Sequence, residues 1–204
     1  GDEAKAAEYS KEAAELKELV ENKLWNGKHE FFETLQTDTL ANVREAIGFI
    51  PWYFNMPDNK KYDAAWKQVT DEKGFSAPYV LTTCERRSPL FRTHGTGTCE
   101  WDGAVWPFAT SQTLTAMANY INNYPEPIVG SKEFFHDMEV YVESQHHRGR
   151  PYIGEYLDET NGAWLMGDRE RSRYYNHSTF NDLMITGIVG LRPQADGSII
   201  VNPL

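Results

Sequence analysis

The sequence has few cysteines, no long apolar run and no excess of positive charge, and each of these deficits excludes a class of protein. Its 204 residues contain only two cysteines, Cys84 and Cys99, which is too few for a disulfide scaffold. The two could close one loop, worth about 3 kcal/mol in an oxidising compartment, or they could be two buried thiols. No uninterrupted apolar run approaches the roughly 18 residues of a membrane-spanning helix. The start of the chain does not look like a signal peptide, and because it begins with Gly1 rather than Met we expect a processed or truncated product.

The balance of charge disfavours polyanionic partners. With 30 acidic and 20 basic side chains the formal net charge is -10, whereas binding to nucleic acid requires a basic surface. Binding to an anionic membrane surface is disfavoured for the same reason. A hydrophobic content of 40% and an aromatic content of 13% predict a packed globular protein, large enough for one domain or for one domain with a small appendage.

Apolar residues three and four positions apart predict a mainly helical fold. The expected helices cover residues 3–24, 38–47, 61–70, 108–124, 131–147 and 179–186. Residues 28–34 are expected to form a short strand or extended turn, residues 49–54 an apolar loop, and residues 188–191 and 198–201 two strands around Asp196-Gly197. Six helices in succession could form about three antiparallel hairpins, and a site would then lie in the long loops at one end.

The loop from Gly154 to Gly162 is the strongest candidate for chemistry. Glu155 lies there close to the aromatic side chains of Tyr152, Tyr156 and Trp164. A carboxylate held between rings can transfer protons while the rings stack on a sugar, and glycosidic hydrolysis commonly uses two carboxyl groups, one of which activates water. Glu155 is therefore a candidate general base. The alternative is a polar loop whose acids cap a helix or lie in solvent.

The acids that follow Glu155 have a structural interpretation. Asp158 is expected to form an Asx-type turn with Asn161 and Gly162, and Glu159 is expected to be structural as well. Only one of the carboxylates in this loop is therefore assigned to catalysis.

A second aromatic and acidic stretch runs from Trp101 to Trp106. Trp101 and Trp106 could form a platform for a sugar, with Asp102 accepting hydrogen bonds from its hydroxyl groups. The alternative is that both indoles fill the core.

The histidines do not predict a metal centre, and no cofactor is expected. His146 and His147 are adjacent, so on a helix their side chains diverge by about 100° and cannot easily bind one ion. His177 lies in a loop between Asn176 and Ser178, where it could contact a ligand or cap a helix.

These stretches resemble a known family, the six-hairpin glycosidases, which include trehalase, processing α-glucosidase and mannosylglycerate hydrolase. The resemblance rests on a Trp-x-Gly-x-x-Trp motif and on a Glu-x-x-Asp-x-x-x-Gly motif. Their defined positions are Trp101, Gly103 and Trp106, and Glu155, Asp158 and Gly162. Residues 44–52, 106–113, 175–182, 190–193 and 201–204 also look like the family, so the resemblance covers nearly the whole chain.

The resemblance implies a partial (α/α)6 toroid of helical hairpins with short β-hairpins and a C-terminal β segment. It also implies inverting hydrolysis of α-linked sugars. Glu155 falls where the family places its general base, and the substrate-binding positions that it implies are Trp101, Asp102, Gly103, Trp106, Tyr156 and His177. Ala104 and Asn161 stand where many members have Pro and Thr, which could change loop rigidity or specificity.

The family places its general acid upstream of the first helix of this chain. The resemblance therefore implies that residues 1–187 are the C-terminal half of the barrel and residues 188–204 the start of a C-terminal β region. An oligosaccharide or glycoside is the expected substrate. The exposed apolar helix faces of a half barrel would be covered by the missing N-terminal half or by self-association. Relatives that degrade polysaccharides are often exported, which favours a periplasmic or extracellular location.

Two other functions fit the same residues. One is a non-catalytic carbohydrate-binding or structural helical module, which would bind a sugar without hydrolysing it. The other is an (α/α)-barrel polysaccharide lyase, which needs a Tyr or His base and a basic groove for uronates. The acidic composition disfavours the lyase.

Overall fold

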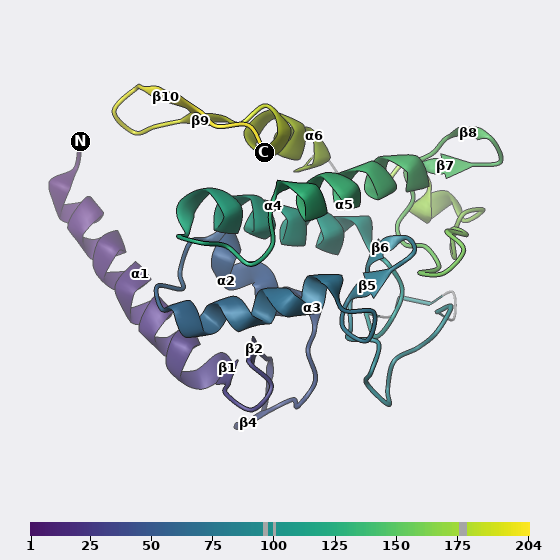
Figure 1. Ribbon diagram of the computed structural model, residues 1–204, viewed down its shortest axis with the longest axis horizontal. Coiled ribbons are helices and arrows are strands. Elements are labelled where there is room, and N and C mark those ends of the chain that lie inside the picture. Colours follow the sequence, from purple (N-terminus) through teal and green to yellow (C-terminus); the bar gives the residue numbers. More distant parts are fainter. Residues whose placement is uncertain (96–97, 100, 176–178) are drawn as a thin grey trace.

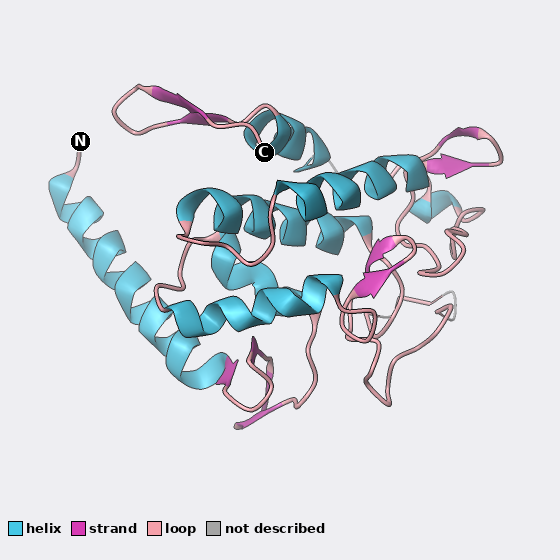
Figure 2. Ribbon diagram, viewed as in Figure 1, coloured by secondary structure: helices cyan, strands magenta, loops and turns pink. Residues whose placement is uncertain are grey.

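The computed structural model describes residues 1–95, 98–99, 101–175 and 179–204, and helices dominate these residues (Figures 1 and 2). The helical segments are α1 (Glu3–Leu24), η1 (Ala46–Phe49), α2 (Ile50–Tyr53), η2 (Lys60–Trp66), α3 (Lys67–Thr70), α4 (Pro107–Asn123), α5 (Ser131–Ser144), η3 (Glu170–Ser172), α6 (Thr179–Leu183) and the π-helical η4 (Met184–Ile188). The strands are β1 (Trp25–Asn26), β2 (Phe31–Phe32), β3 (Leu35–Gln36), β4 (Thr39–Leu40), β5 (Ser76–Ala77), β6 (Val80–Leu81), β7 (His146–His147), β8 (Arg150–Pro151), β9 (Leu191–Pro193) and β10 (Ile199–Val201). They form five antiparallel pairs of consecutive strands.

The centre of the fold is an antiparallel helical hairpin made by α4 and α5 (Figure 1). Pro107 opens α4 at a position where a missing backbone N–H costs nothing. The hydroxyl group of Tyr141, near the end of α5, donates a hydrogen bond to the carbonyl of Pro107 at 3.2 Å, so the two helices run in opposite directions. This hairpin agrees with part of a helical toroid, as the sequence predicted.

The core is rich in aromatic side chains, most of which come from β2, η1, α2, η2, α4 and α5. The ring of Trp66 stacks on that of Tyr120 with centroids 5.0 Å apart and 9° between their planes. Trp52 meets Trp66 edge to face at 5.4 Å. Such pairs add to the stabilisation that comes from burial alone.

Two predictions about residues 38–54 are wrong. The helix expected at residues 38–47 is replaced by β4 and a bend, where Asn42 has a left-handed φ of 57° and its backbone N–H donates to the carboxylate of Glu33 at 3.0 Å. The apolar loop expected at residues 49–54 is instead helical in η1 and α2. Pro51 fits the first turn of α2, and Trp52 is buried beneath that turn.

The long helix α1 lies along one side of the molecule and buries no residue completely (Figure 1). The side chain of Asp2 accepts a hydrogen bond from the N–H of Lys5 at 3.1 Å and so caps the helix. Only Val20 and Leu24 pack against the core, while Leu16 and Leu19 are exposed. No helix of the described residues is both long and apolar enough to cross a bilayer.

The chain ends in a β-hairpin, as predicted, but its first strand covers Leu191–Pro193 and not residues 188–191, because η4 extends to Ile188. Arg192 of β9 pairs with Ile200 of β10, and the turn between the strands contains Gly197 at a φ of +84°. The backbone N–H of Ser198 donates to the carboxylate of Asp196 at 2.9 Å, which fixes the turn.

Isolated β-bridges tie the loops at one end of the hairpins together, and we call them the loop ladder. They pair Glu45 with Cys84, Thr82 with Val105, Val105 with Leu157, and Leu157 with Trp164. The ladder therefore holds four chain segments that lie far apart in the sequence side by side, and it positions the candidate site.

Candidate active site

The loop ladder joins the two stretches that the sequence singled out. The backbone N–H of Val105 donates to the carbonyl of Leu157 at 3.0 Å, and the N–H of Leu157 donates to the carbonyl of Val105 at the same distance. The Trp101–Trp106 stretch and the loop of Glu155 consequently lie side by side.

Three aromatic rings form a continuous stack across this junction. The rings of Trp101 and Trp106 have centroids 4.3 Å apart with 22° between their planes, and Trp106 and Tyr156 are 4.5 Å apart with 10° between theirs. Trp106 is 3% exposed and Tyr156 is not exposed at all, whereas Trp101 is 42% exposed. Trp101 is therefore the ring of the stack that offers a surface to a ligand, and the other two support it.

Asp102 and Gly103 shape the loop that carries Trp101. Two nitrogens of the Arg92 guanidinium lie 2.8 and 3.1 Å from Oδ2 of Asp102, while Oδ1 is buried and has no hydrogen-bond partner within the described residues. A Cβ atom at Gly103 would lie 2.2 Å from the backbone oxygen of Arg92. Only glycine allows the two segments to approach so closely.

Glu155 is a buried carboxylate held from one side. Glu155 is 9% exposed, and its Oε2 accepts a hydrogen bond of 2.6 Å from the hydroxyl of Ser172. Ser172, at the end of η3, is itself 1% exposed. A β-bridge between Gly154 and Arg173 fixes the two segments against each other.

Glycine is required at position 154 for this arrangement. A Cβ atom there would lie 2.3 Å from the ring of Trp164 and 2.7 Å from that of Tyr152. The rings close over the backbone immediately before Glu155 and contribute to the burial of this segment.

Asp158 and Glu159 organise the turn, and the Asx-type turn predicted at Asp158 is confirmed. Oδ1 of Asp158 accepts hydrogen bonds from the N–H and the hydroxyl of Thr160, both at 2.7 Å, and from the N–H of Asn161 at 3.2 Å. Burial works to raise the pKa of Asp158, but the hydrogen bonds from Thr160, His94 and Asn161 together hold that pKa below its ordinary value. The carboxylate of Glu159, fully buried, accepts from the backbone N–H of His94.

His94, Asp158 and Glu159 also have potential ligand atoms within 4.8 Å of one another, which makes them the metal-binding candidate of the described residues. Nδ1 of His94 lies 2.7 Å from Oδ2 of Asp158, so the histidine and the carboxylate already satisfy each other. The hydrogen bonds are enough to explain why these three groups lie together.

The prediction that His146 and His147 lie at the end of a helix is wrong. The helix expected to end at residue 147 ends at Ser144, and His146 and His147 lie in strand β7, where neighbouring side chains point to opposite faces. His177 lies outside the described residues.

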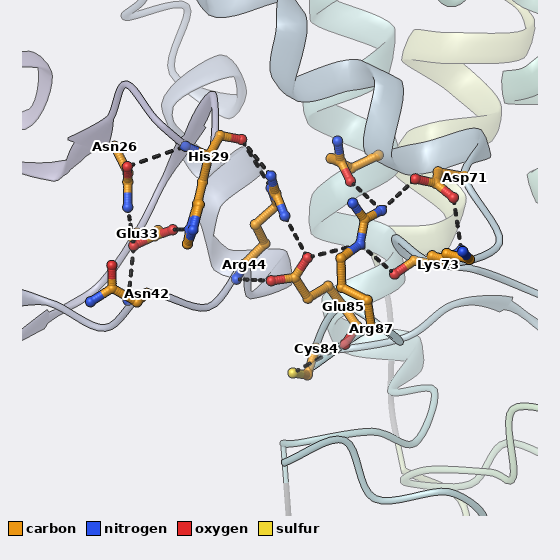
Figure 3. Close-up of polar contacts among 11 residues, drawn as sticks. Asn26, His29, Glu33, Asn42, Arg44, Asp71, Lys73, Cys84, Glu85 and Arg87 are labelled. Atoms are coloured by element: carbon orange, nitrogen blue, oxygen red, sulfur yellow. Dashed lines mark hydrogen bonds and ion pairs between the residues drawn. The ribbon is translucent and has the colours of Figure 1, made fainter. Parts of the chain in front are cut away.

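A polar network around Glu33, Arg44 and Glu85 adjoins the first bridge of the loop ladder (Figure 3). The Glu33 side chain accepts hydrogen bonds from the amide of Asn26 and the N–H of Asn42, both at 3.0 Å. The guanidinium of Arg44 donates to Oε2 of Glu85 at 2.6 Å, and the N–H of Arg44 donates to Oε1 at 3.0 Å. Glu45 follows Arg44 in the sequence and Cys84 precedes Glu85. The contacts of Arg44 with Glu85 therefore stabilise the β-bridge between Glu45 and Cys84, the first of the loop ladder.

The cysteines do not form a disulfide. Cys84 is buried and Cys99 is exposed, and both are free, so neither the loop-closing bond nor the pair of buried thiols is correct. Burial raises the pKa of the Cys84 thiol to about 11, which makes it a poor nucleophile.

Sequence reasoning missed Ser172 and a group of arginines near Glu155. Ser172 lies in a charged run, Asp168 to Arg173, with no periodic pattern that would predict a buried hydroxyl. The sequence does contain a weak indication of the arginines. Arg148, Arg150 and Arg173 form a local concentration of basic residues in a chain that is acidic as a whole.

Helical hairpins whose end loops are tied together by backbone bridges agree with part of a helical-toroid fold. The family model described as the mannosylglycerate hydrolase MGH1-like glycoside hydrolase domain matches residues 1–178, and the chain belongs to this family.

Solved structures show the same fold. A structure described as "Sialidase" is 68% identical to this chain and superposes with a TM-score of 0.95 over 100% of it. A GH63 mannosylglycerate hydrolase from Thermus thermophilus, in complex with glucose, is 19% identical over 70% of the chain with a TM-score of 0.52. The same hydrolase with Tris and D-glycerate gives a TM-score of 0.56 at 18% identity over 72% of the chain. A search of curated proteins finds no match.

The chain is much shorter than these relatives. It spans 19% of the sialidase chain and 33% and 32% of the two hydrolase chains. The similarity therefore covers one part of each longer polypeptide.

Proposed function

We propose that this chain is the C-terminal part of the catalytic domain of an inverting glycoside hydrolase that acts on α-linked sugars, with Glu155 as the general base. The observation that carries the proposal is the position of Glu155. The neighbouring ring of Tyr156 belongs to the stack that ends in the exposed Trp101, and Ser172 holds the carboxylate itself. Membership of a glycoside hydrolase family gives this geometry its chemical interpretation.

In an inverting mechanism one carboxylate removes a proton from the attacking water, and a second carboxylic acid protonates the leaving oxygen from the opposite side of the sugar. The two groups lie roughly 6.5–9.5 Å apart to leave room for that water. Glu155 supplies the first group, and we assign the second to polypeptide upstream of this chain. On this proposal the chain alone is inactive or nearly so.

The sugar subsite proposed here contains Trp101, Asp102, Gly103, Trp106, Tyr156 and His177. Trp101 stacks on the apolar face of the ring, with Trp106 and Tyr156 behind it. Asp102, whose side chain is 35% exposed, accepts hydrogen bonds from sugar hydroxyls while Arg92 fixes its orientation.

The proposed domain division assigns residues 1–187 to the barrel and residues 188–204 to the start of a C-terminal β region. An apolar groove of about 300 Å³ between α1 and α2 is lined by side chains such as Leu16, Leu24 and Ile50. A second groove of about 260 Å³ lies between α5 and η4, where Phe135 and Val142 are exposed. We assign both grooves to packing of the rest of the barrel, with self-association as the alternative.

The molecules bound in the Thermus structures support a small glycoside as the substrate. One of those complexes contains glucose and another contains D-glycerate. The hydrolase in these complexes is less than 20% identical to this chain, so we propose only the class of substrate.

The test is an assay of the chain on α-linked disaccharides and aryl glycosides, alone and with an upstream segment from the parent polypeptide restored. Turnover that requires the upstream segment and is lost in Glu155→Gln supports the proposal. Sugar binding that survives Glu155→Gln, without hydrolysis in either form of the protein, indicates the non-catalytic carbohydrate-binding module instead. An unsaturated product that absorbs in the ultraviolet indicates a lyase.

A further inference from the structure

We propose that a basic pocket beside the loop of Glu155 binds a sugar that carries a carboxylate. The pocket has a volume of about 410 Å³, which accommodates a group of monosaccharide size. The lining residues that matter here are Arg148, Arg150, Arg173, Tyr152, Tyr174 and Asp168.

The pocket concentrates positive charge in a chain whose formal net charge is -10. Three arginines face one aspartate there, and Arg148 pairs with Asp168 at 3.0 Å. Within the described part of the chain, neither Arg150 nor Arg173 forms an ion pair with a carboxylate. Planar guanidinium groups bind carboxylates through two parallel hydrogen bonds, so these two arginines favour a carboxylate ligand.

The exposed ring of Tyr174 gives the pocket a surface suited to a sugar ring, and the buried ring of Tyr152 lies beside it. The rings of Tyr152 and Tyr174 have centroids 6.5 Å apart with 47° between their planes. The hydroxyl of Tyr152 donates to the carbonyl of Gly167 at 2.9 Å, which holds that ring in place. Aromatic faces beside charged donors favour a ligand that has both an apolar ring face and an anionic group.

The backbone of Tyr174 is strained. Its φ is 58°, a left-handed value that is rare for a bulky side chain and persists only where the surrounding structure enforces it. The adjacent N–H of Tyr175 donates to the carbonyl of Ile153 at 3.1 Å, which ties this segment to the residues just before Glu155.

The pocket and Glu155 share the same two chain segments. Tyr152 lies three residues before Glu155, Arg173 is bridged to Gly154, and Ser172 donates to the Glu155 carboxylate. A carboxylated sugar unit bound at the arginines would therefore lie against the two chain segments that hold Glu155, and we propose that it belongs to the substrate of Glu155. This link to hydrolysis rests on the proposed function, whereas the binding itself does not.

Isothermal titration of the 204-residue chain with glucuronate tests the inference, with glucose and acetate as matched ligands. Glucuronate is expected to bind about tenfold or more tightly than either control, because only glucuronate offers both the ring and the charge. Binding should weaken with added salt, since solvent-exposed charges are screened. Arg173→Gln and Arg150→Gln should each reduce the affinity for glucuronate about tenfold.

The matched control is Arg171→Gln, which changes an exposed arginine two residues from Arg173 that does not line the pocket. It should bind glucuronate like the unsubstituted chain, and circular dichroism should show that all three variants are folded. Equal affinity for glucose, equal affinity for acetate, or unchanged binding in both pocket variants would overturn the inference. Glu155→Gln should retain glucuronate binding, so failure of the catalytic proposal is distinguishable from failure of this one.

Discussion

The ring of Trp106 lies parallel to the ring of Tyr156, with centroids 4.5 Å apart and 10° between their planes. The two residues belong to loops that are distant in the sequence, and this contact joins the aromatic motif to the loop of Glu155. The buried rings hold the loops together, while the exposed Trp101 at the end of the stack is available to a ligand.

The stack predicts different effects for its two tryptophans. Trp106→Ala should lower the free energy of unfolding by about 3–5 kcal/mol, because it empties a buried site between two rings. Trp101→Ala should lower it by about 1 kcal/mol or less, since half-exposed side chains contribute little. Urea denaturation of both variants measures the difference. Equal losses would contradict the assignment of Trp106 as support and Trp101 as contact surface.

The hydrogen bond between Ser172 and Glu155 predicts coupled stabilities. Ser172→Ala should cost about 1–3 kcal/mol, because a buried carboxylate loses a donor. In a Glu155→Gln background the same substitution should cost clearly less, since no charge then needs that donor. A double-mutant cycle from chemical denaturation measures the coupling. Additive losses would show that the contact does not stabilise the carboxylate.

Gly103 predicts a steric effect in the Trp101–Trp106 stretch. Gly103→Ala would place a Cβ atom 2.2 Å from the backbone oxygen of Arg92, and the backbone must move to accept it. We expect a loss of about 1–3 kcal/mol in the free energy of unfolding. Gly27→Ala is the control, because the nearest atom to a Cβ there is 4.0 Å away. A thermal melt that shifts equally for both variants would contradict this explanation.

Asp137 predicts a pH-dependent stability. Burial and, to a smaller extent, the charge of Glu133 together raise the pKa of this aspartate from an ordinary 3.8 to about 7. Between these values the unfolded chain loses the proton while the folded chain keeps it, so stability falls by about 1.4 kcal/mol per pH unit as the pH rises. Below the unfolded pKa both states are protonated and the effect vanishes.

Asp137→Asn removes this dependence. The variant should match the unsubstituted chain near the acidic end of the range and exceed it by a few kcal/mol at a pH above 7. Urea denaturation across the pH range measures the two curves. Parallel curves would show that Asp137 does not keep its proton in the folded chain.

Much of the helical framework could be predicted from the sequence, because regular periodicity defines α1, α4 and α5. The region around residues 38–54 could not. Asn42 adopts a left-handed conformation and binds Glu33 from another segment, and Pro51 opens a helix where an apolar loop was expected. Tertiary contacts decide both outcomes, and local patterns do not encode them.

The candidate site shows the same division. Motif spacing identified Glu155 and the Trp101–Trp106 stretch, but not the mutual hydrogen bonds of Val105 and Leu157 that bring them together. Single bridges between irregular loops have no period in the sequence. The net charge of the whole chain likewise concealed the local basic pocket around Arg150 and Arg173.

The central claim is that Glu155 is the general base of an inverting hydrolase whose acid lies upstream. The most direct measurement is proton NMR of the sugar released from an α-glycoside by the chain joined to its upstream segment. We expect the β-anomer to form first, and Glu155→Gln to lose about two or more orders of magnitude in kcat with the protein still folded. Release of the α-anomer, or full turnover by Glu155→Gln, would contradict the account.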